Sequence, residues 1–327
     1  MTIGIAANLI ALFGVVGYVL WRAYPATEAV RLRNALSLAT GCNRDFDWTP
    51  PHFPADFRAE RLPPPAEFRD IVASLRLGDR SGDWDKALAL ASHLVERAGD
   101  LGPVRADPLT TYRAIRDGHG YCADFVKAFL ALAHAAGLSV RQWGFSFDGF
   151  GGHGHTVVEV YDRQRRKWLL LDVFNNFHVV DAHSGEPLGA LECRQALLAS
   201  AGKLRMRANG PGRPGFVHSE TALEYYRRGV HQWYLLQGNA VFSSYAHPLV
   251  RMAGRLSRGL APVAASIVGV RPRIRILETS ENARQVSQLR MLRRQLVVAA
   301  GLALLLLATL AAQLIVAARV GASSGSG

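Results

Sequence analysis

The chain contains little cysteine and almost no lysine. Cys42, Cys122 and Cys193 are its three cysteines among 327 residues, and their odd number and wide spacing exclude a disulfide framework and paired zinc-finger ligands. Only four of the 38 basic residues are lysines, and no zinc-finger pattern or RNP aromatic set accompanies the formal charge of +12. We therefore predict no nucleic-acid partner, and free thiols that suit a reducing compartment.

Charged side chains are absent from two long stretches, 1–21 and 295–318. At about 1.5 Å per helical residue, each is long enough to cross a hydrocarbon core of roughly 30 Å. The second is predicted to be a transmembrane helix. The first could be a cleaved signal peptide, but it lacks a basic n-region, has no A-x-A site and is followed by Arg22. An uncleaved anchor is therefore the better interpretation.

Arginines flank both stretches on the side of the long central segment. Three follow the first stretch and four precede the second, namely Arg22, Arg31 and Arg33, and Arg284, Arg290, Arg293 and Arg294. Because basic flanks are retained in the cytoplasm, they predict a cytoplasmic central segment. That rule weakens for long loops, so an outward-facing domain is the alternative. These arginines also suit anionic headgroups, and membrane lipid is an expected partner.

Periodicity predicts the local structure of the central segment. Apolar residues at helical spacing predict two helices over 70–99, a third over 109–116, and a fourth that begins at Cys122 and stops before Gly137. Three strand-like segments follow, at 139–147, 155–162 and 167–174. The polar turn between the last two predicts an antiparallel hairpin, and the whole order predicts an α+β fold.

Beyond residue 188 the sequence predicts helices again, over 190–203 and 222–238. The second mixes tyrosine, tryptophan and arginine, which suits either an interfacial surface or a core-facing helix. The segment 259–270 could lie on the membrane or pack inside. The predicted domains are an anchor (1–22), a proline-rich strap (23–68), a globular α+β domain (69–190), a helical extension that could lie on the membrane surface (191–294), a transmembrane helix (295–319) and a flexible tail (320–327).

Cys122 lies where the sequence GHGYCADF enters a predicted helix. The dipole and free N–H groups of a first helical turn favour a thiolate and lower a thiol pKa that starts near ~8.5. The same N–H groups could hold the oxyanion that forms when a carbonyl is attacked. A lone cysteine at such a place is more often a small buried residue, so its reactivity depends on partners.

Two such partners lie in the predicted hairpin. His155 follows the glycine-rich sequence GFGGHG, and Asp172 lies in the next strand. If the turn closes near residues 162–167, the two side chains face each other to within about one residue pair. A hydrogen bond from Asp172 to one ring nitrogen would aim the other at the thiol. Cys122, His155 and Asp172 are therefore the predicted catalytic residues.

Other assignments compete with this one. His119 is an alternative base, although its short turn favours a surface or capping role. A mixed zinc site could use His119, Cys122, His153 and His155, but their spacing matches no ordinary zinc pattern.

The remaining polar and thiol side chains have structural explanations. Cys42 and Cys193 are interpreted as structural, and Glu159 as a strand residue that pairs with an arginine. Turn chemistry accounts for His178, Asp181 and His183.

Three segments resemble the signature segments of the transglutaminase-like superfamily, in the order Cys, His, Asp: GYCADFVKAFLALAHAAGLSVR, GHGHTVVEVY and KWLLLDVFNN. The resemblance covers roughly residues 85–185. It implies a papain-like core, in which the cysteine helix packs on an antiparallel sheet, and chemistry through an acyl thioester. It also implies that Cys122 is the nucleophile, His155 the base and acid, and Asp172 the orienting residue.

The chain departs from the family's pattern in places. Thr156 stands where many members have tryptophan after the histidine. The oxyanion-hole side chain is not identifiable, with Trp84 and Gln142 as candidates. Ligands of the calcium-dependent members have no clear counterpart, so we predict no calcium, no other metal and no cofactor.

Together these features predict a membrane-anchored cysteine acyltransferase or amidohydrolase of bacterial type that attacks an amide or ester carbonyl. Its expected partners are a protein, peptide or other amide- or ester-bearing substrate, membrane lipid and a membrane protein. Its expected location is a bacterial inner membrane, with the globular domain in the cytoplasm. The alternative is a non-catalytic transglutaminase-like subunit that binds or assembles a larger membrane complex, such as envelope or exopolysaccharide machinery.

Overall fold

The computed structural model describes residues 2–39, 46–97, 99, 101–104, 106–256, 265–266 and 268–324. Within it the chain forms two compact units. One contains Met1–Leu36, Gly149–Gly152 and Arg284–Gly327, and the other contains Ser37–Asp148 and His153–Ala283. Cys42 and most of the segment 259–270 lie outside the described residues.

The first unit contains the two apolar helices. The helix α1 (Thr2–Arg22) and the helix α12 (Ala283–Ser324) are each long and apolar enough to cross a membrane, as the sequence predicts. At about 1.5 Å per residue the 42 residues of α12 extend roughly 60 Å, about twice the thickness of a hydrocarbon core. The arginines that precede the predicted span therefore belong to the same continuous helix.

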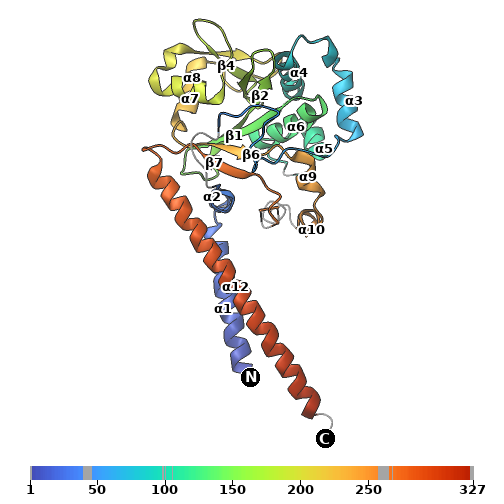
Figure 1. Ribbon diagram of the computed structural model, residues 1–327, viewed down its shortest axis with the longest axis vertical. Helices are drawn as coiled ribbons and strands as arrows, with labels where there is room; N and C mark the ends of the chain where they lie inside the picture. The colour runs from blue at the N-terminus through green and yellow to red at the C-terminus, as the bar shows by residue number, and fades with distance from the viewer. Residues whose placement is uncertain are drawn as a thin grey trace. The chain divides into compact units, whose positions relative to one another are not determined.

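Polar contacts link the parts of this unit. Asn8 on α1 donates through Nδ2 to the Leu306 carbonyl of α12 at 3.2 Å and to Gln313 Oε1 at 3.4 Å, and the two helices lie side by side (Figure 1). The helix α2 (Ala26–Ser37) binds the loop 149–152, because Asn34 Nδ2 donates to the Phe150 carbonyl at 2.8 Å.

The second unit is built on a five-stranded antiparallel sheet. Its strands have the order β3-β2-β1-β6-β7, and they are β1 (Val140–Ser146), β2 (Gly154–Asp162), β3 (Lys167–Leu171), β6 (Trp233–Gln237) and β7 (Arg273–Ile276). The register pairs Phe145 with His155 and Val158 with Leu171. The predicted hairpin of β2 and β3 is confirmed. A separate two-stranded sheet joins β4 (Phe177–Asp181) to β5 (Leu204–Ala208).

Helices cover both faces of the large sheet (Figure 1). The helices before it are α3 (Ala66–Ser74), α4 (Asp83–Val95), α5 (Pro108–Arg116) and α6 (Cys122–Ala135), with a short 3-10 turn η1 (Leu77–Asp79). Between β3 and β6 lie α7 (Ala190–Ala199), the 3-10 turn η2 (Ala201–Lys203) and α8 (Ser219–Arg228), and between β6 and β7 lie α9 (Val241–Ala246) and α10 (Pro248–Leu256). The predicted α+β class, with the cysteine helix on an antiparallel sheet, is confirmed.

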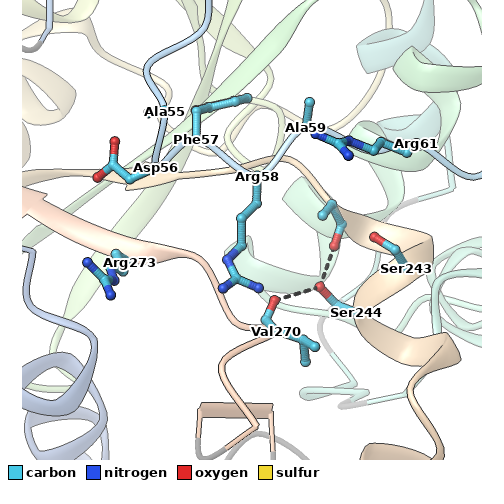
Figure 2. A pocket seen from close by; sticks show the side chains of 11 residues that line it. Ala55, Asp56, Phe57, Arg58, Ala59, Arg61, Ser243, Ser244, Val270 and Arg273 are labelled. Carbon is cyan, nitrogen blue, oxygen red and sulfur yellow. Dashed lines mark hydrogen bonds between the residues drawn. The ribbon is translucent and has the colours of Figure 1, made fainter.

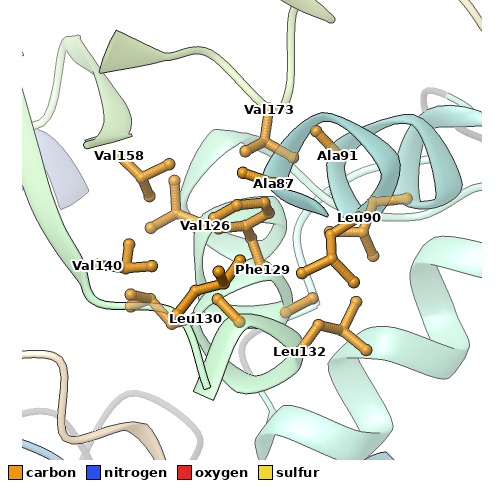
Figure 3. Packing of buried hydrophobic residues seen from close by; sticks show 14 of the residues in the cluster. Ala87, Leu90, Ala91, Val126, Phe129, Leu130, Leu132, Val140, Val158 and Val173 are labelled. Atoms are coloured by element: carbon orange, nitrogen blue, oxygen red, sulfur yellow. The ribbon is translucent and has the colours of Figure 1, made fainter. Parts of the chain in front are cut away.

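Alternation along the strands divides the core into two clusters. Val140 and Val158 face α4 and α6, where Leu90 and Phe129 are fully buried (Figure 3). Leu171 belongs to the same cluster. The other side chains of the same strands pack with residues of α7 and α8 in a second cluster. Because neighbouring strand residues point to opposite faces, one sheet supplies both cores.

The predicted helix over 222–238 is wrong in its second half. The helix α8 ends at Arg228, and residues 233–237 form β6 between β1 and β7. Gly229 follows α8 at a point of close packing, where a Cβ would lie 2.5 Å from Phe145 Cδ2. The side chains of WYLLQ suit a strand, and pairing on both sides supplies their backbone hydrogen bonds. This tertiary pairing is not visible in the local sequence.

A buried ion pair stabilises the face opposite α6. Glu159 accepts from Arg141 Nε at 2.6 Å, from the Ala190 N–H at 2.6 Å and from the indole of Trp143. Arg141 also donates to the Phe46 carbonyl and lies 4.4 Å from the Trp168 ring centroid. Both charges are therefore fully partnered, as buried charges require.

Glu159→Gln should destabilise the fold by about 3–5 kcal/mol, because it leaves the Arg141 cation buried without a counter-charge. The midpoint of urea unfolding, followed by tryptophan fluorescence in an uncharged detergent, measures the loss. Glu186→Gln is the matched control, since Glu186 is an exposed partner of Arg165 at 3.5 Å and should leave the midpoint nearly unchanged. Equal midpoints for both variants would contradict the expectation.

Candidate active site

Cys122 is the first residue of α6 and is partly exposed. The turn before it depends on Gly120, whose φ of +113° suits glycine and where a Cβ would lie 3.1 Å from Ile115 Cγ1. Asp124 fixes the helix start by accepting from the N–H groups of Tyr121 at 3.2 Å and Val104 at 3.1 Å. The thiol therefore sits beside the free N–H groups of a well-capped helix.

His155 is the second residue of β2 and is buried. Its Nε2 donates to Asp172 Oδ2 at 2.7 Å, and His155 lies close enough to Cys122 to lower the pKa of that thiol. The register would place Asp172 opposite Val157, so this bond runs diagonally to the next residue pair on the same face. The structure thus brings together all three residues that the sequence predicts to be catalytic.

Asp172 is held by further donors that the sequence analysis missed. The Asn175 side chain donates to Oδ2 at 2.8 Å and its backbone N–H to Oδ1 at 3.1 Å. Tyr226 donates its hydroxyl to Oδ2 at 2.7 Å from α8. Asn175 lies in the segment KWLLLDVFNN, three residues after Asp172, so the sequence could have indicated it. Tyr226 lies 54 residues from Asp172 in the chain, and only the packing of α8 identifies it.

These contacts set the protonation states. Burial raises the pKa of Cys122, but the hydrogen bond and charge of His155 and the Thr156 backbone N–H outweigh it and lower the pKa below its usual value. Burial lowers the pKa of His155, but the charge and hydrogen bond of Asp172 raise it to about 10. Between these two pKa values the site therefore holds a thiolate and an imidazolium.

The same rules make Cys193 inert. Burial raises the pKa of its thiol to about 12, and the charges of Glu159 and Glu192 add to the effect. Cys193 packs inside the second core cluster with α7. The two thiols therefore differ in their surroundings, since one faces a histidine and the other faces carboxylates.

Trp84 and Asp181 have contacts that give them structural roles. Trp84 packs in the core cluster that contains residues of α4 and α6. Its ring centroid lies 5.2 Å from that of His178, so its indole is part of the core packing. Asp181 caps a turn by accepting from the N–H groups of His183 and Ser184, as its turn chemistry predicts. Within the described part of the chain, no three His, Cys, Asp or Glu side chains gather as metal ligands.

A basic cavity of about 500 Å³ lies elsewhere in the second unit (Figure 2). The segment 55–61 forms one wall, and residues of α9 and the start of β7 form another. Arg58, Arg61 and Arg273 line it, whereas Cys122, His155 and Asp172 do not. The candidate catalytic residues are therefore separate from this cavity.

The alkylation rate of Cys122 by iodoacetamide should rise with pH through a midpoint below that of a free thiol, near ~8.5. His155→Ala should move this midpoint above the free-thiol value, because burial, which raises the pKa, then acts without the opposing imidazolium. Peptide mass spectrometry measures the extent of alkylation of Cys122 and Cys193 in the same sample, with Cys193 as the unreactive control. A wild-type midpoint at the free-thiol value would refute the ion pair.

Comparison with known proteins agrees with this geometry. The family model described as the transglutaminase-like superfamily matches residues 70–173, which include α4 to α6, β1 to β3 and all three candidate residues. Searches of curated proteins and of solved structures found no match. Residues 70–173 form a domain of the transglutaminase-like superfamily.

Proposed function

We propose that the protein is a membrane-anchored cysteine acyltransferase or amidohydrolase of transglutaminase-like type, with Cys122 as nucleophile. The observation that carries the proposal is that the 2.7 Å hydrogen bond between His155 and Asp172 lies beside the Cys122 thiol, whose pKa His155 lowers. Each member is held from a different element, α6, β2 and the end of β3, so the arrangement is a product of the fold. A buried structural cysteine would need none of these partners.

The first step is attack of the Cys122 thiolate on an amide or ester carbonyl carbon. A C–S bond forms, and the oxyanion of the intermediate lies near the N–H groups at the start of α6. When the C–N or C–O bond breaks, the His155 imidazolium gives its proton to the leaving amine or alcohol. Asp172 keeps the ring oriented throughout, and Tyr226 and Asn175 keep Asp172 in place.

The second step resolves the thioester. Neutral His155 takes a proton from water or an amine as that molecule attacks the carbonyl, and the C–S bond breaks to release the thiolate. Water gives a carboxylic acid, and an amine gives a new amide. The chemistry supports both outcomes, and the expected substrate is a protein, peptide or other molecule that carries an amide or ester.

An acyl-enzyme burst tests this chemistry. The full-length protein in uncharged detergent should release about one equivalent of p-nitrophenolate rapidly from p-nitrophenyl acetate and carry an acetyl group on Cys122, as read by peptide mapping. His155→Ala should slow acylation by about 10²–10⁴-fold, and Cys122→Ala should lack the burst. Cys193→Ala is the control and should keep it.

The absence of an acetyl group on Cys122 would contradict the proposed chemistry. A wild-type protein whose Cys122 has a lowered pKa but acquires no acetyl group would overturn the proposal. It would favour a transglutaminase-like domain that binds or assembles a larger membrane complex.

The two apolar helices support a location in a membrane, where we place both as spans of a bacterial inner membrane. Side chains such as Phe13 on α1 and Leu304 on α12 are 73% and 68% exposed, which suits contact with lipid. Asn8 and Gln313 bind each other between the helices, where a polar side chain needs a partner. A membrane-protein partner on the remaining faces belongs to the same proposal.

The arginine flanks favour a cytoplasmic globular domain, with both termini on the other side of the membrane. Alkaline phosphatase fused to either end should then be active, because it folds outside the cytoplasm. Green fluorescent protein at the same two ends is the matched control and should be dark. A fluorescent fusion at either end would reverse the assigned orientation.

A further inference from the structure

Two arginines lie over aromatic rings at the edge of the candidate site. Arg228 at the end of α8 has its guanidinium carbon 5.2 Å from the centroid of the Phe147 ring. Arg213 has its guanidinium carbon 5.6 Å from the centroid of the Phe174 ring. Such stacking fixes a flexible cation in a defined position.

The first arginine is connected to the site by a short series of rings. Phe147 contacts Tyr225 with centroids 5.0 Å apart, and Tyr225 contacts His155 at 5.8 Å. Burial raises the pKa of Tyr225, the charges of Cys122 and Asp172 add to this, and Arg228 opposes it. Tyr225 is thus close to both Arg228 and the reactive pair.

The second arginine reaches the site through one ring. Phe174 contacts His155 at 6.3 Å and Phe125, one turn along α6 from Cys122, at 5.3 Å. The loop that carries Arg213 is tied to the site, because the Gly215 N–H donates to the Asn175 carbonyl at 2.9 Å. The Nε of Arg213 is buried and has no hydrogen-bond partner within the described residues.

Neither guanidinium forms an ion pair with a carboxylate of the described residues. Acidic groups nearby are engaged elsewhere. Glu224 on α8 binds Arg227 at 2.5 Å, and Asp148 accepts from the Ser146 hydroxyl at 2.6 Å and from the His153 N–H at 3.2 Å. Among the described residues, two guanidinium groups that form no ion pair therefore border the site.

We propose that the acyl donor is an acidic peptide whose carboxylates bind Arg213 and Arg228 beside the scissile carbonyl. The inference rests on the proposed function and adds its substrate class. A guanidinium in a fixed position can donate two parallel hydrogen bonds to the two oxygens of a carboxylate. The rings of Phe147, Phe174 and Tyr225 offer an apolar surface between the charges, which suits the backbone and side chains of a peptide.

The same charges bear on the second step. They repel a protonated amine and leave neutral water unaffected, so they favour hydrolysis over transfer to a lysine. The positive charge of Arg213 and Arg228 therefore influences both which acyl donor binds and whether water or an amine resolves the thioester.

Two alkylating reagents of similar size but different charge test the effect of Arg213 and Arg228 on the site. The ratio of the Cys122 rates with iodoacetate and with iodoacetamide cancels the thiolate fraction, because both reagents attack the same thiolate. In the full-length protein, Arg213→Gln and Arg228→Gln should each lower this ratio by about 2–5-fold at low ionic strength, and less at 0.5 M salt. Arg227→Gln is the control, because Arg227 already binds Glu224.

A second measurement tests the peptide. A ten-residue peptide with four glutamates should slow alkylation of Cys122 by iodoacetamide in the wild type, and its glutamine counterpart should not. The double variant Arg213→Gln, Arg228→Gln should lose this protection.

An unchanged reagent ratio in both single variants would overturn the inference. A lowered ratio without protection by the acidic peptide would overturn the peptide as the donor. Both readouts need only the Cys122 thiolate, so they are independent of the acyl burst and separate a wrong substrate class from a wrong chemistry.

Discussion

The buried carboxylate of Asp172 is the group on which the site depends. A carboxylate in a dry interior is costly unless donors and a positive charge surround it. Asp172 receives hydrogen bonds from His155, Asn175 and Tyr226, which belong to three parts of the chain. These bonds and the charge of His155 outweigh burial and lower the pKa of Asp172. Its retained charge keeps His155 protonated, and protonated His155 in turn keeps Cys122 ionised.

The same principle explains the rest of the core. Arg141 and Glu159 form a second buried pair on the same face of the sheet, where three donors and the surrounding tryptophans satisfy both charges. Glu159 also lies near Cys193 and raises the pKa of that thiol. One pair thus stabilises the packing and leaves a thiol inert, whereas the other activates a thiol. The sign of the neighbouring charge decides between these outcomes, because burial by itself raises the pKa of either thiol.

Local patterns predicted the elements that carry the site, because helix stops, strand periodicity and a polar turn are short-range signals. They placed the start of α6 at Cys122 and the hairpin of β2 and β3, and the hairpin geometry brought His155 near Asp172. Long-range pairing was not predictable in this way. The strand β6 lies between strands distant in sequence, and its sequence predicts a helix because tyrosine, tryptophan and leucine suit both. Tyr226 was visible only as part of an aromatic helix, since its role depends on where α8 packs.

The low dielectric that sustains the triad also extends the influence of charges at its edge. Aromatic rings lie between Arg228 and His155 and between Arg213 and His155, so part of the path between these charges is apolar and the remainder is open to screening by salt. If the proposed substrate binds, the positive potential of the two guanidinium groups would be felt at its carbonyl more strongly than it would be in bulk water. In such a site, the side chains that select a substrate by charge also act on the negative charge that develops on its carbonyl oxygen. Under the proposed function, recognition and catalysis would both depend on these two arginines, so a change at either one would alter both together.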